Sequence, residues 1–141
     1  MSRLTLAQAN TIVSVALKKA REMKTKPLTV VVLDDAGHVR ALQREDGANM
    51  FRNDIAIGKA FASIGMGAAS RTLLHRAKDN PEFYGALAAV GQGKFVPQTG
   101  AVLIKDKDGT VLGAAGGSGG TGDEDEAVCI AGIEAAGLAW G

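Results

Sequence analysis

The chain has 141 residues, and its 16 Lys and Arg residues nearly balance its 15 Asp and Glu residues, which gives a formal net charge of +1. This balance argues against a nucleic-acid partner, because a nucleic-acid-binding face needs an excess of basic side chains. The single cysteine excludes an internal disulfide bond and any metal site built from several cysteines.

The N-terminal segment predicts neither a secretory leader nor a membrane span. Residues 1–8 lack the apolar stretch of a signal peptide. No uncharged run approaches the roughly 18 apolar residues that a membrane-spanning helix needs. We therefore expect a cytoplasmic protein with no membrane partner, and one domain covering residues 1–141.

The first third of the chain predicts a helix followed by a β-hairpin. Thr5 and Gln8 form a capping-box pattern, and apolar residues then recur every three or four positions as far as Met23. Two strand-like runs follow, residues 28–33 and residues 38–44, and an Asp-Asp-Ala-Gly turn separates them. The first run is apolar throughout, which predicts a strand that is buried on both faces.

The middle of the chain predicts three helices and a second hairpin. The helices are expected from about Asn53, over Ser70–Ala77 and over Pro81–Val90, where Pro81 suits a first helical position. The hairpin strands are expected over Ala101–Lys105 and Thr110–Ala115, because an Asp-Gly turn joins these two runs.

A glycine-rich segment, residues 116–122, then leads to a closing helix from Asp123 to about Ala139, whose capping box is Thr121 with Glu124. The predicted order is α-β-β-α-α-α-β-β-α. Neither hairpin needs a crossover connection. We therefore predict an α+β fold with a mostly antiparallel sheet flanked by helices.

The glycine-rich segment contains the spacing of a dinucleotide-binding turn, but its surroundings oppose that function. Four acidic residues, 123–126, stand where a pyrophosphate would lie against the helix N-terminus, and no Gly-Lys-Ser/Thr follows as in a P-loop. Two interpretations stay open. The glycines only allow a sharp turn, or the segment holds a ligand carboxylate or oxyanion through backbone N–H groups and two hydroxyls. The ligand-binding residues would be Gly117, Ser118, Gly119, Gly120 and Thr121.

Three polar residues, Arg44, Asp46 and Lys59, fall where the second strand and the following helix meet. If that helix packs over the end of the sheet, the three side chains converge, and Arg44 and Lys59 grip a carboxylate or a haem propionate. The alternative is a surface ion-pair network. Acid or base chemistry at this site would come from Lys59, Asp46, Asp125 or Glu126.

His38 and His75 are the only imidazoles, and their separation shows no metal-ligand spacing, so we predict no metal site. Each is a surface histidine or, alternatively, a haem ligand. Cys129 lies among apolar residues, which predicts a buried and inert thiol.

Several motifs occur together in a family-specific order. They are VVVLDDAGH at 30–38, REDGA at 44–48, IGKA at 57–60, GAAGGSGGT at 113–121 and DEA at 125–127. In this combination the chain resembles the GlcG/HbpS family of haem-degrading-type domains, which includes the C-terminal domain of PduO-like proteins. The resemblance implies an antiparallel sheet between helices, a homo-oligomer, haem as a cofactor and, in some members, haem degradation.

Two functional hypotheses follow, together with the alternative of an accessory protein without a site. In the first, the protein binds haem or another tetrapyrrole, with His38 or His75 on the iron and Arg44 and Lys59 on the propionates. In the second, it is an enzyme or binder for a small carboxylate-bearing metabolite. The glycine-rich segment then holds an oxyanion, and Lys59 or a nearby carboxylate serves as acid or base.

Overall fold

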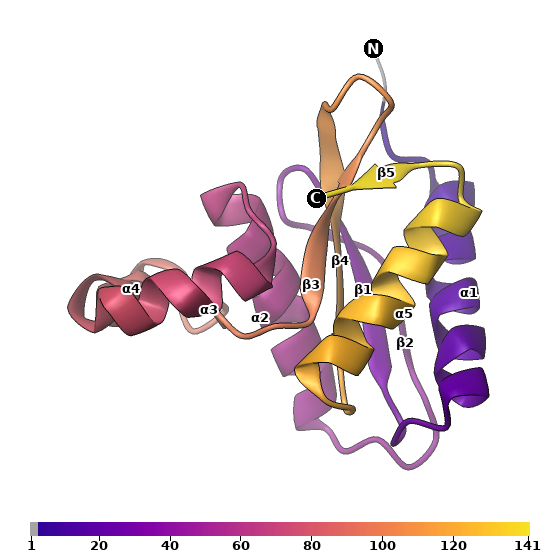
Figure 1. Ribbon diagram of the computed structural model, residues 1–141, viewed down its shortest axis with the longest axis horizontal. Coiled ribbons are helices and arrows are strands. Elements are labelled where there is room, and N and C mark those ends of the chain that lie inside the picture. The colour runs from indigo at the N-terminus through magenta and orange to yellow at the C-terminus, as the bar shows by residue number, and fades with distance from the viewer. Residues whose placement is uncertain (1–2) are drawn as a thin grey trace.

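The predicted antiparallel sheet lies between two layers of helices in the computed structural model, which describes residues 3–141 (Figure 1). The helices are α1 (Leu6–Met23), α2 (Phe51–Met66), α3 (Ser70–Asp79), α4 (Pro81–Val90) and α5 (Gly122–Ala135). The strands are β1 (Thr29–Asp34), β2 (Val39–Arg44), β3 (Ala101–Lys105), β4 (Val111–Ser118) and β5 (Ala139–Trp140). The α+β class, both hairpins and the order of the first nine elements are confirmed.

The two hairpins form one sheet because β1 pairs with β4, which gives the strand order β2-β1-β4-β3-β5. All pairs are antiparallel. Thr29 lies opposite Ser118, and Asp34 lies opposite Gly113. The start of β1 and the end of β4 therefore share one end of the sheet, and the turn between β1 and β2 lies at the other end.

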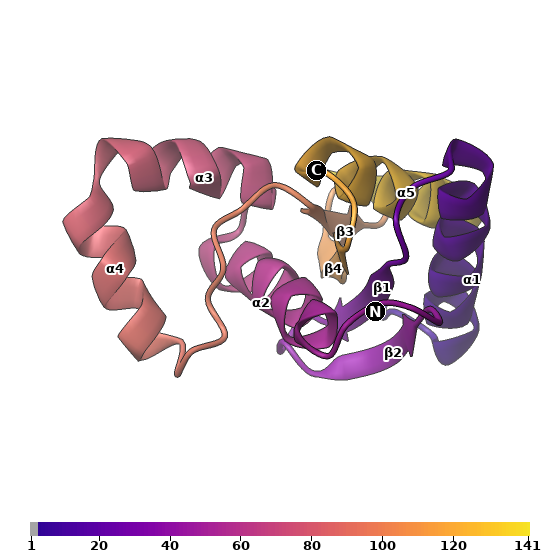
Figure 2. The same ribbon diagram turned by 90° about the horizontal axis from the view of Figure 1, so that it is seen from below.

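The sheet is buried on both faces, as the apolar run of β1 predicts. Val30 and Val32 pack with α1 and α5, whereas Val31 and Leu33 pack with α2. Figure 2 shows α1 and α5 on one side of the sheet and α2 on the other. Alternate residues of a strand point to opposite faces, so a strand covered on both sides has no polar face.

Helix α2 lies unusually close to β4 because β4 contains glycine at the contact. A Cβ atom on Gly116 would stand 2.6 Å from the carbonyl oxygen of Ala56. A side chain at this position would push the helix away from the sheet. This close approach brings the polar face of α2 over the last residues of β4.

Helices α3 and α4 form an arm that projects away from the sheet on the α2 side (Figures 1 and 2). Ser70 and Leu73 are the buried residues of α3, and Tyr84 is the buried residue of α4. The large apolar side chains of Phe83 and Val90 on α4 are exposed, Val90 to 77%. Much of the apolar surface of α4 is therefore left uncovered by the rest of residues 3–141.

Most boundaries lie within two residues of the sequence-based prediction, and two differ by more. Strand β4 continues to Ser118, so Gly116 and Gly117 belong to the strand and not to a loop. Helix α5 ends at Ala135, and Trp140 pairs with Ile104 as part of β5. Gly137 adopts a positive φ of 76°, which is the usual helix-ending conformation of glycine. Within residues 3–141, no helix has the length and apolar character to cross a membrane.

Candidate functional site

A buried ion pair lies at the end of the sheet where β4 finishes. The Nζ atom of Lys59 lies 3.1 Å from Oδ2 of Asp125 and donates a second hydrogen bond, 3.0 Å long, to the carbonyl oxygen of Gly117. The residues Lys59 and Asp125 are only 6% and 1% exposed. Oδ1 of Asp125 accepts a 3.0 Å hydrogen bond from the backbone N–H of Gly120. The pair therefore ties α2, β4 and α5 together.

The electrostatics of this pair are set by burial. Burial raises the pKa of the Asp125 carboxyl, while the charge of Lys59 and the hydrogen bonds from Lys59 and Gly120 act in the opposite direction. An ion pair taken out of water is maintained only when both partners and their hydrogen bonds are present. Asp125 is therefore a carboxylate whose protonation depends on its contact with Lys59.

The backbone makes room for the Lys59 ammonium group at Gly100. This residue has a φ of +142°, and a Cβ atom there would stand 2.7 Å from the Lys59 Nζ atom. Any other residue at this position would collide with the charged group. Gly100 thus fixes the place of the ammonium group beside the end of β4.

A pocket of about 430 Å³, here called the Lys59 pocket, opens beside the pair. One wall is a stripe of α2 with helical spacing, namely Arg52, Ile55 and Lys59. The remaining lining residues are Leu74, Gln98, Thr99, Ser118, Gly120, Thr121, Gly122, Asp123 and Asp125. Figure 1 shows the start of α2, the end of β4 and the start of α5 at the same end of the sheet.

Arg52 is the functional candidate that the sequence analysis missed. Its Nη1 group donates a 3.2 Å hydrogen bond to Oγ of Ser118, which is fully buried. Among the described residues, Arg52 makes no ion pair. The spacing of seven positions from Lys59 was the available signal, because residues seven apart lie on the same helix face.

The acidic residues 123, 125 and 126 at the start of α5 make their ion pairs with Lys59 and Arg71 rather than with Arg52, whose charge nevertheless opposes the effect of burial and lowers the pKa of Asp125. Asp123 and Glu126 both pair with Arg71 of α3, and Nη2 of Arg71 lies 3.1 Å from Oε1 of Glu126. The hydrogen bonds that Arg71 donates, first those to Glu126 and then that to Asp123, raise the pKa of Arg71. The contacts dock α3 onto α5 and pair Asp123, which lines the Lys59 pocket, with a cation outside that lining.

The prediction that backbone N–H groups of the glycine-rich segment are free to bind a ligand is wrong at three positions. The N–H of Gly117 donates to the carbonyl of Gly100 at 2.9 Å within the sheet. The N–H of Gly120 donates to Asp125, and that of Thr121 donates to Oε1 of Glu124 at 2.9 Å. The capping box predicted at Thr121 therefore uses the Thr121 N–H group, which is then not free for a ligand.

The candidate ligand-binding residues of this segment divide among three places. Ser118, Gly120 and Thr121 line the Lys59 pocket. Gly117 is buried inside β4 and contributes its carbonyl oxygen to Lys59. Gly119 lines a neighbouring pocket together with Gly120 and Thr121. The backbone N–H groups of Gly117, Gly120 and Thr121 are used within the chain, so the side chains supply most of the polar surface of the Lys59 pocket.

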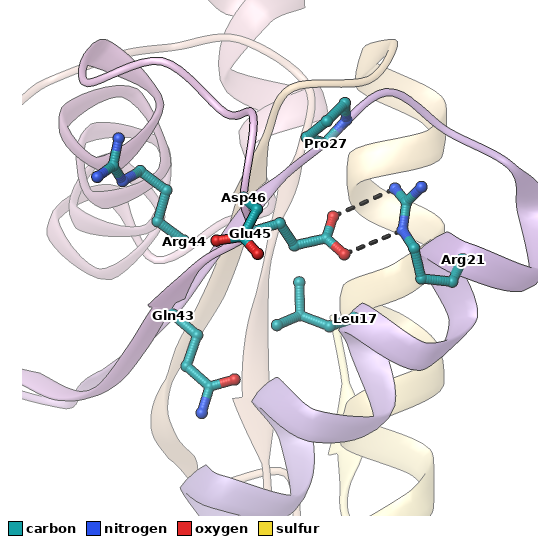
Figure 3. A pocket seen from close by; sticks show the side chains of 7 residues that line it. All are labelled: Leu17, Arg21, Pro27, Gln43, Arg44, Glu45 and Asp46. Atoms are coloured by element: carbon teal, nitrogen blue, oxygen red, sulfur yellow. Dashed lines mark hydrogen bonds and ion pairs between the residues drawn. The ribbon is translucent and has the colours of Figure 1, made fainter.

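Arg44 and Asp46 do not converge with Lys59, so that prediction is wrong. They line a separate pocket of about 590 Å³, the edge-strand pocket, between α1 and the end of the edge strand β2 (Figure 3). Its other lining residues are Leu17, Arg21, Pro27, Gln43 and Glu45. Nη1 of Arg44 donates to the carbonyl of Ala48 at 3.0 Å. The physical reason is strand order, because β1 lies between β2 and β4.

The two histidines lie outside both pockets. The side chain of His38 is 81% exposed at the turn after β1, at the far end of the sheet from the Lys59 pocket, and its Nδ1 atom lies 3.9 Å from Oδ1 of Asp34. His75 is exposed on α3. Within residues 3–141, no three His, Cys, Asp or Glu side chains are grouped to hold a metal ion. Cys129 is fully buried, as predicted, and burial raises the pKa of its thiol.

Comparison with known proteins places this geometry in a family. Among curated proteins, a 15.0 kDa protein of Citrobacter freundii, encoded in the dhaT–dhaS intergenic region, is 28% identical over 125 residues, which are 89% of this chain and 86% of that protein. Its description names no function.

Solved structures share the fold. The structure of a PduOC:heme complex matches with a TM-score of 0.86 and 24% identity over 98% of both chains. A double mutant of HbpS from Streptomyces reticuli matches with a TM-score of 0.82 and 26% identity over 95% of this chain and 87% of that one. The family model described as haem degrading protein HbpS-like matches residues 4–134, which confirms the resemblance seen in the motifs. The chain therefore belongs to the HbpS-like family.

Proposed function

We propose that the protein binds a small organic anion, with a ligand carboxylate held by Arg52 in the Lys59 pocket. One observation carries this proposal: Arg52 lines the pocket, and none of the described residues supplies it with a carboxylate partner. An arginine that makes no ion pair in a concave site is well suited to a carboxylate, because its N–H groups form a planar fork.

The remaining groups of the pocket support a small ligand. Arg52 uses one N–H on Ser118, which orients the guanidinium and leaves other N–H groups free for a ligand. Lys59 adds positive charge at the pocket wall, although Asp125 balances it. Ile55 and Leu74 offer apolar contact for a short carbon chain. The volume of about 430 Å³ lies in the range of small-molecule sites.

If the protein is an enzyme that converts the bound anion, two of the four predicted acid or base residues lie where they could act on it. Lys59 and Asp125 line the Lys59 pocket, whereas Asp46 lines the edge-strand pocket and Glu126 pairs with Arg71. We propose Lys59 and Asp125 as the acid and base for such a reaction, since proton transfer requires a group within hydrogen-bond reach of the ligand.

The test is ligand-induced thermal stabilisation with a panel of short carboxylic acids. A ligand that binds only the folded protein raises the melting temperature as its concentration rises. We expect Arg52→Met to abolish the shift, and Arg44→Met, in the edge-strand pocket, to preserve it. Loss of the shift in Arg44→Met with retention in Arg52→Met would overturn the proposal, as would the absence of any shift in the unchanged protein.

Haem binding is a second candidate, which the family and the likeness to the PduOC:heme complex support. The Lys59 pocket does not fit haem, because no His, Met, Cys or Tyr lines it as an axial ligand and eight of its twelve lining residues are polar or charged. The edge-strand pocket also lacks these residue types. We therefore propose that any haem lies on the surface, with His38 or His75 as its ligand.

Hemin titration separates the two candidates. A Soret band that is lost in the double variant His38→Ala/His75→Ala, and kept in Arg52→Met, would support surface haem. If no band forms at micromolar hemin, or if the double variant keeps it, this candidate fails. Haem degradation would follow only if the bound haem is consumed in the presence of a reductant.

We also propose that the chain forms a homo-oligomer through α4. This helix carries exposed Phe83 and Val90, and no charged residue occurs from Phe83 to Gly93. Contiguous exposed apolar surface of this kind is typical of interaction sites. Light scattering after size exclusion tests it, with Val90→Lys expected to shift the protein toward the monomer. A protein that is monomeric without the substitution contradicts it.

A further inference from the structure

A second pocket adjoins the Lys59 pocket across Arg52. This pocket, here called the Lys26 pocket, has a volume of about 310 Å³ and is lined by Lys26, Arg52, Gly119, Gly120, Thr121 and Glu124. It shares Arg52, Gly120 and Thr121 with the Lys59 pocket. Arg52 therefore stands between two hollows, and each hollow has a lysine of its own.

The charges of the Lys26 pocket favour an anion. Lys26 is exposed and, within residues 3–141, makes no ion pair. Glu124 is the acidic group of this pocket, and its Oε1 atom accepts the N–H of Thr121 in the capping box. Lys26 and the shared Arg52 thus outnumber the one carboxylate of this hollow, which is already hydrogen-bonded.

The guanidinium of Arg52 has enough donors for both hollows. An arginine side chain carries five N–H donors, and one of them is directed to Ser118. The other donors lie along the remaining edges of the planar group. Each edge can present parallel N–H groups to one carboxylate. A single arginine can therefore contact two carboxylates, one in each pocket.

From this arrangement we infer that the ligand is a dicarboxylate. One carboxylate lies in the Lys59 pocket and the other lies in the Lys26 pocket, with Arg52 between them. The inference rests on the proposed function, since it extends the anion site of Arg52 to a second charged group. It assigns Lys26 as a specificity residue that acts on the second carboxylate alone.

Isothermal titration at low salt with matched acids tests the inference. The probes are succinate, glutarate and adipate as dicarboxylates, propionate and butyrate as monocarboxylates, and inorganic phosphate as a competitor. We expect at least one dicarboxylate to bind about tenfold more tightly than butyrate. An exposed charge contributes up to about 1 kcal/mol. We therefore expect Lys26→Met to weaken dicarboxylate binding about fivefold and to leave butyrate binding unchanged.

The control variant is Lys24→Met, an exposed lysine two residues away that lines neither pocket. It should leave all affinities unchanged. The inference is overturned if Lys26→Met weakens butyrate and dicarboxylate binding equally, or weakens neither. It is also overturned if phosphate binds more tightly than every dicarboxylate. These outcomes would leave the proposed anion site of Arg52 intact. Failure of every acid to bind the unchanged protein would instead overturn the proposed function itself.

Discussion

Replacement of Lys59 by Met tests the buried ion pair most directly. The substitution keeps a long side chain but removes the ammonium group, and this leaves the Asp125 carboxylate, whose side chain is 2% exposed, with the Gly120 N–H as its remaining hydrogen-bond donor. It also removes the donor to the Gly117 carbonyl. Breaking a buried pair from one side costs about 3–5 kcal/mol, a large part of a typical folding stability of about 5–15 kcal/mol.

Urea unfolding measures this loss. With a slope of about 1–3 kcal/mol per M for a small protein, the unfolding midpoint should fall by about 2 M. Adding Asp125→Asn should restore part of the loss, because the double variant buries no lone charge and Asn keeps an oxygen for Gly120. The control is Arg71→Met at a more exposed ion pair, which should cost no more than about 1 kcal/mol. A cost below about 1 kcal/mol for Lys59→Met would refute the reasoning.

Three further predictions concern stability. Burial raises the pKa of Asp125 above its ordinary 3.8 in the folded state, so the stability of the unchanged protein relative to Asp125→Asn should fall as pH rises through that folded pKa. Urea unfolding of both proteins at several acidic pH values measures this difference in stability. An increase of the difference with pH would contradict the raised pKa. Gly132→Ala should destabilise the folded protein by several kcal/mol, because its Cβ would stand 2.3 Å from the Ile12 carbonyl oxygen. Gly65→Ala, in open space on α2, should instead stabilise the folded protein by about 1 kcal/mol. Thermal melts of the two variants and the unchanged protein compare these effects. Thr5→Ala should cost about 1 kcal/mol by loss of the helix cap, and an unchanged melting temperature would argue against the cap.

The elements that could be predicted from sequence depend on neighbouring residues. The capping boxes at Thr5 and Thr121 form between residues three apart, and both are present. The buried strand β1 and the two turns are likewise local patterns. The end of α5 was harder, because its alanine-rich sequence continues past Ala135 and only the backbone conformation of Gly137 ends the helix.

The site was harder to predict than the fold because it depends on which strands pair. Lys59 and Asp125 were each identified as polar residues of interest, but their contact requires α2 to pack against β4 at Gly116. Arg44 was assigned to the same site because it precedes α2 in sequence. The pairing of β1 with β4 places it two strands away from β4, and no local pattern encodes that pairing.

The pairing of the acidic residues at the start of α5 supports our proposal that α2 supplies the charge for a ligand. Each of the four consecutive acidic residues has a partner within the chain: Glu124 completes the capping box, Asp125 holds Lys59, and the other two hold Arg71. The positive end of the helix is therefore already compensated. Of the two cations that line the Lys59 pocket, Arg52 of α2 is the one without an ion pair among the described residues. The anion site and the stability of α5 should accordingly be separable, with Arg52→Met removing binding while the capping box and the Lys59 pair stay intact.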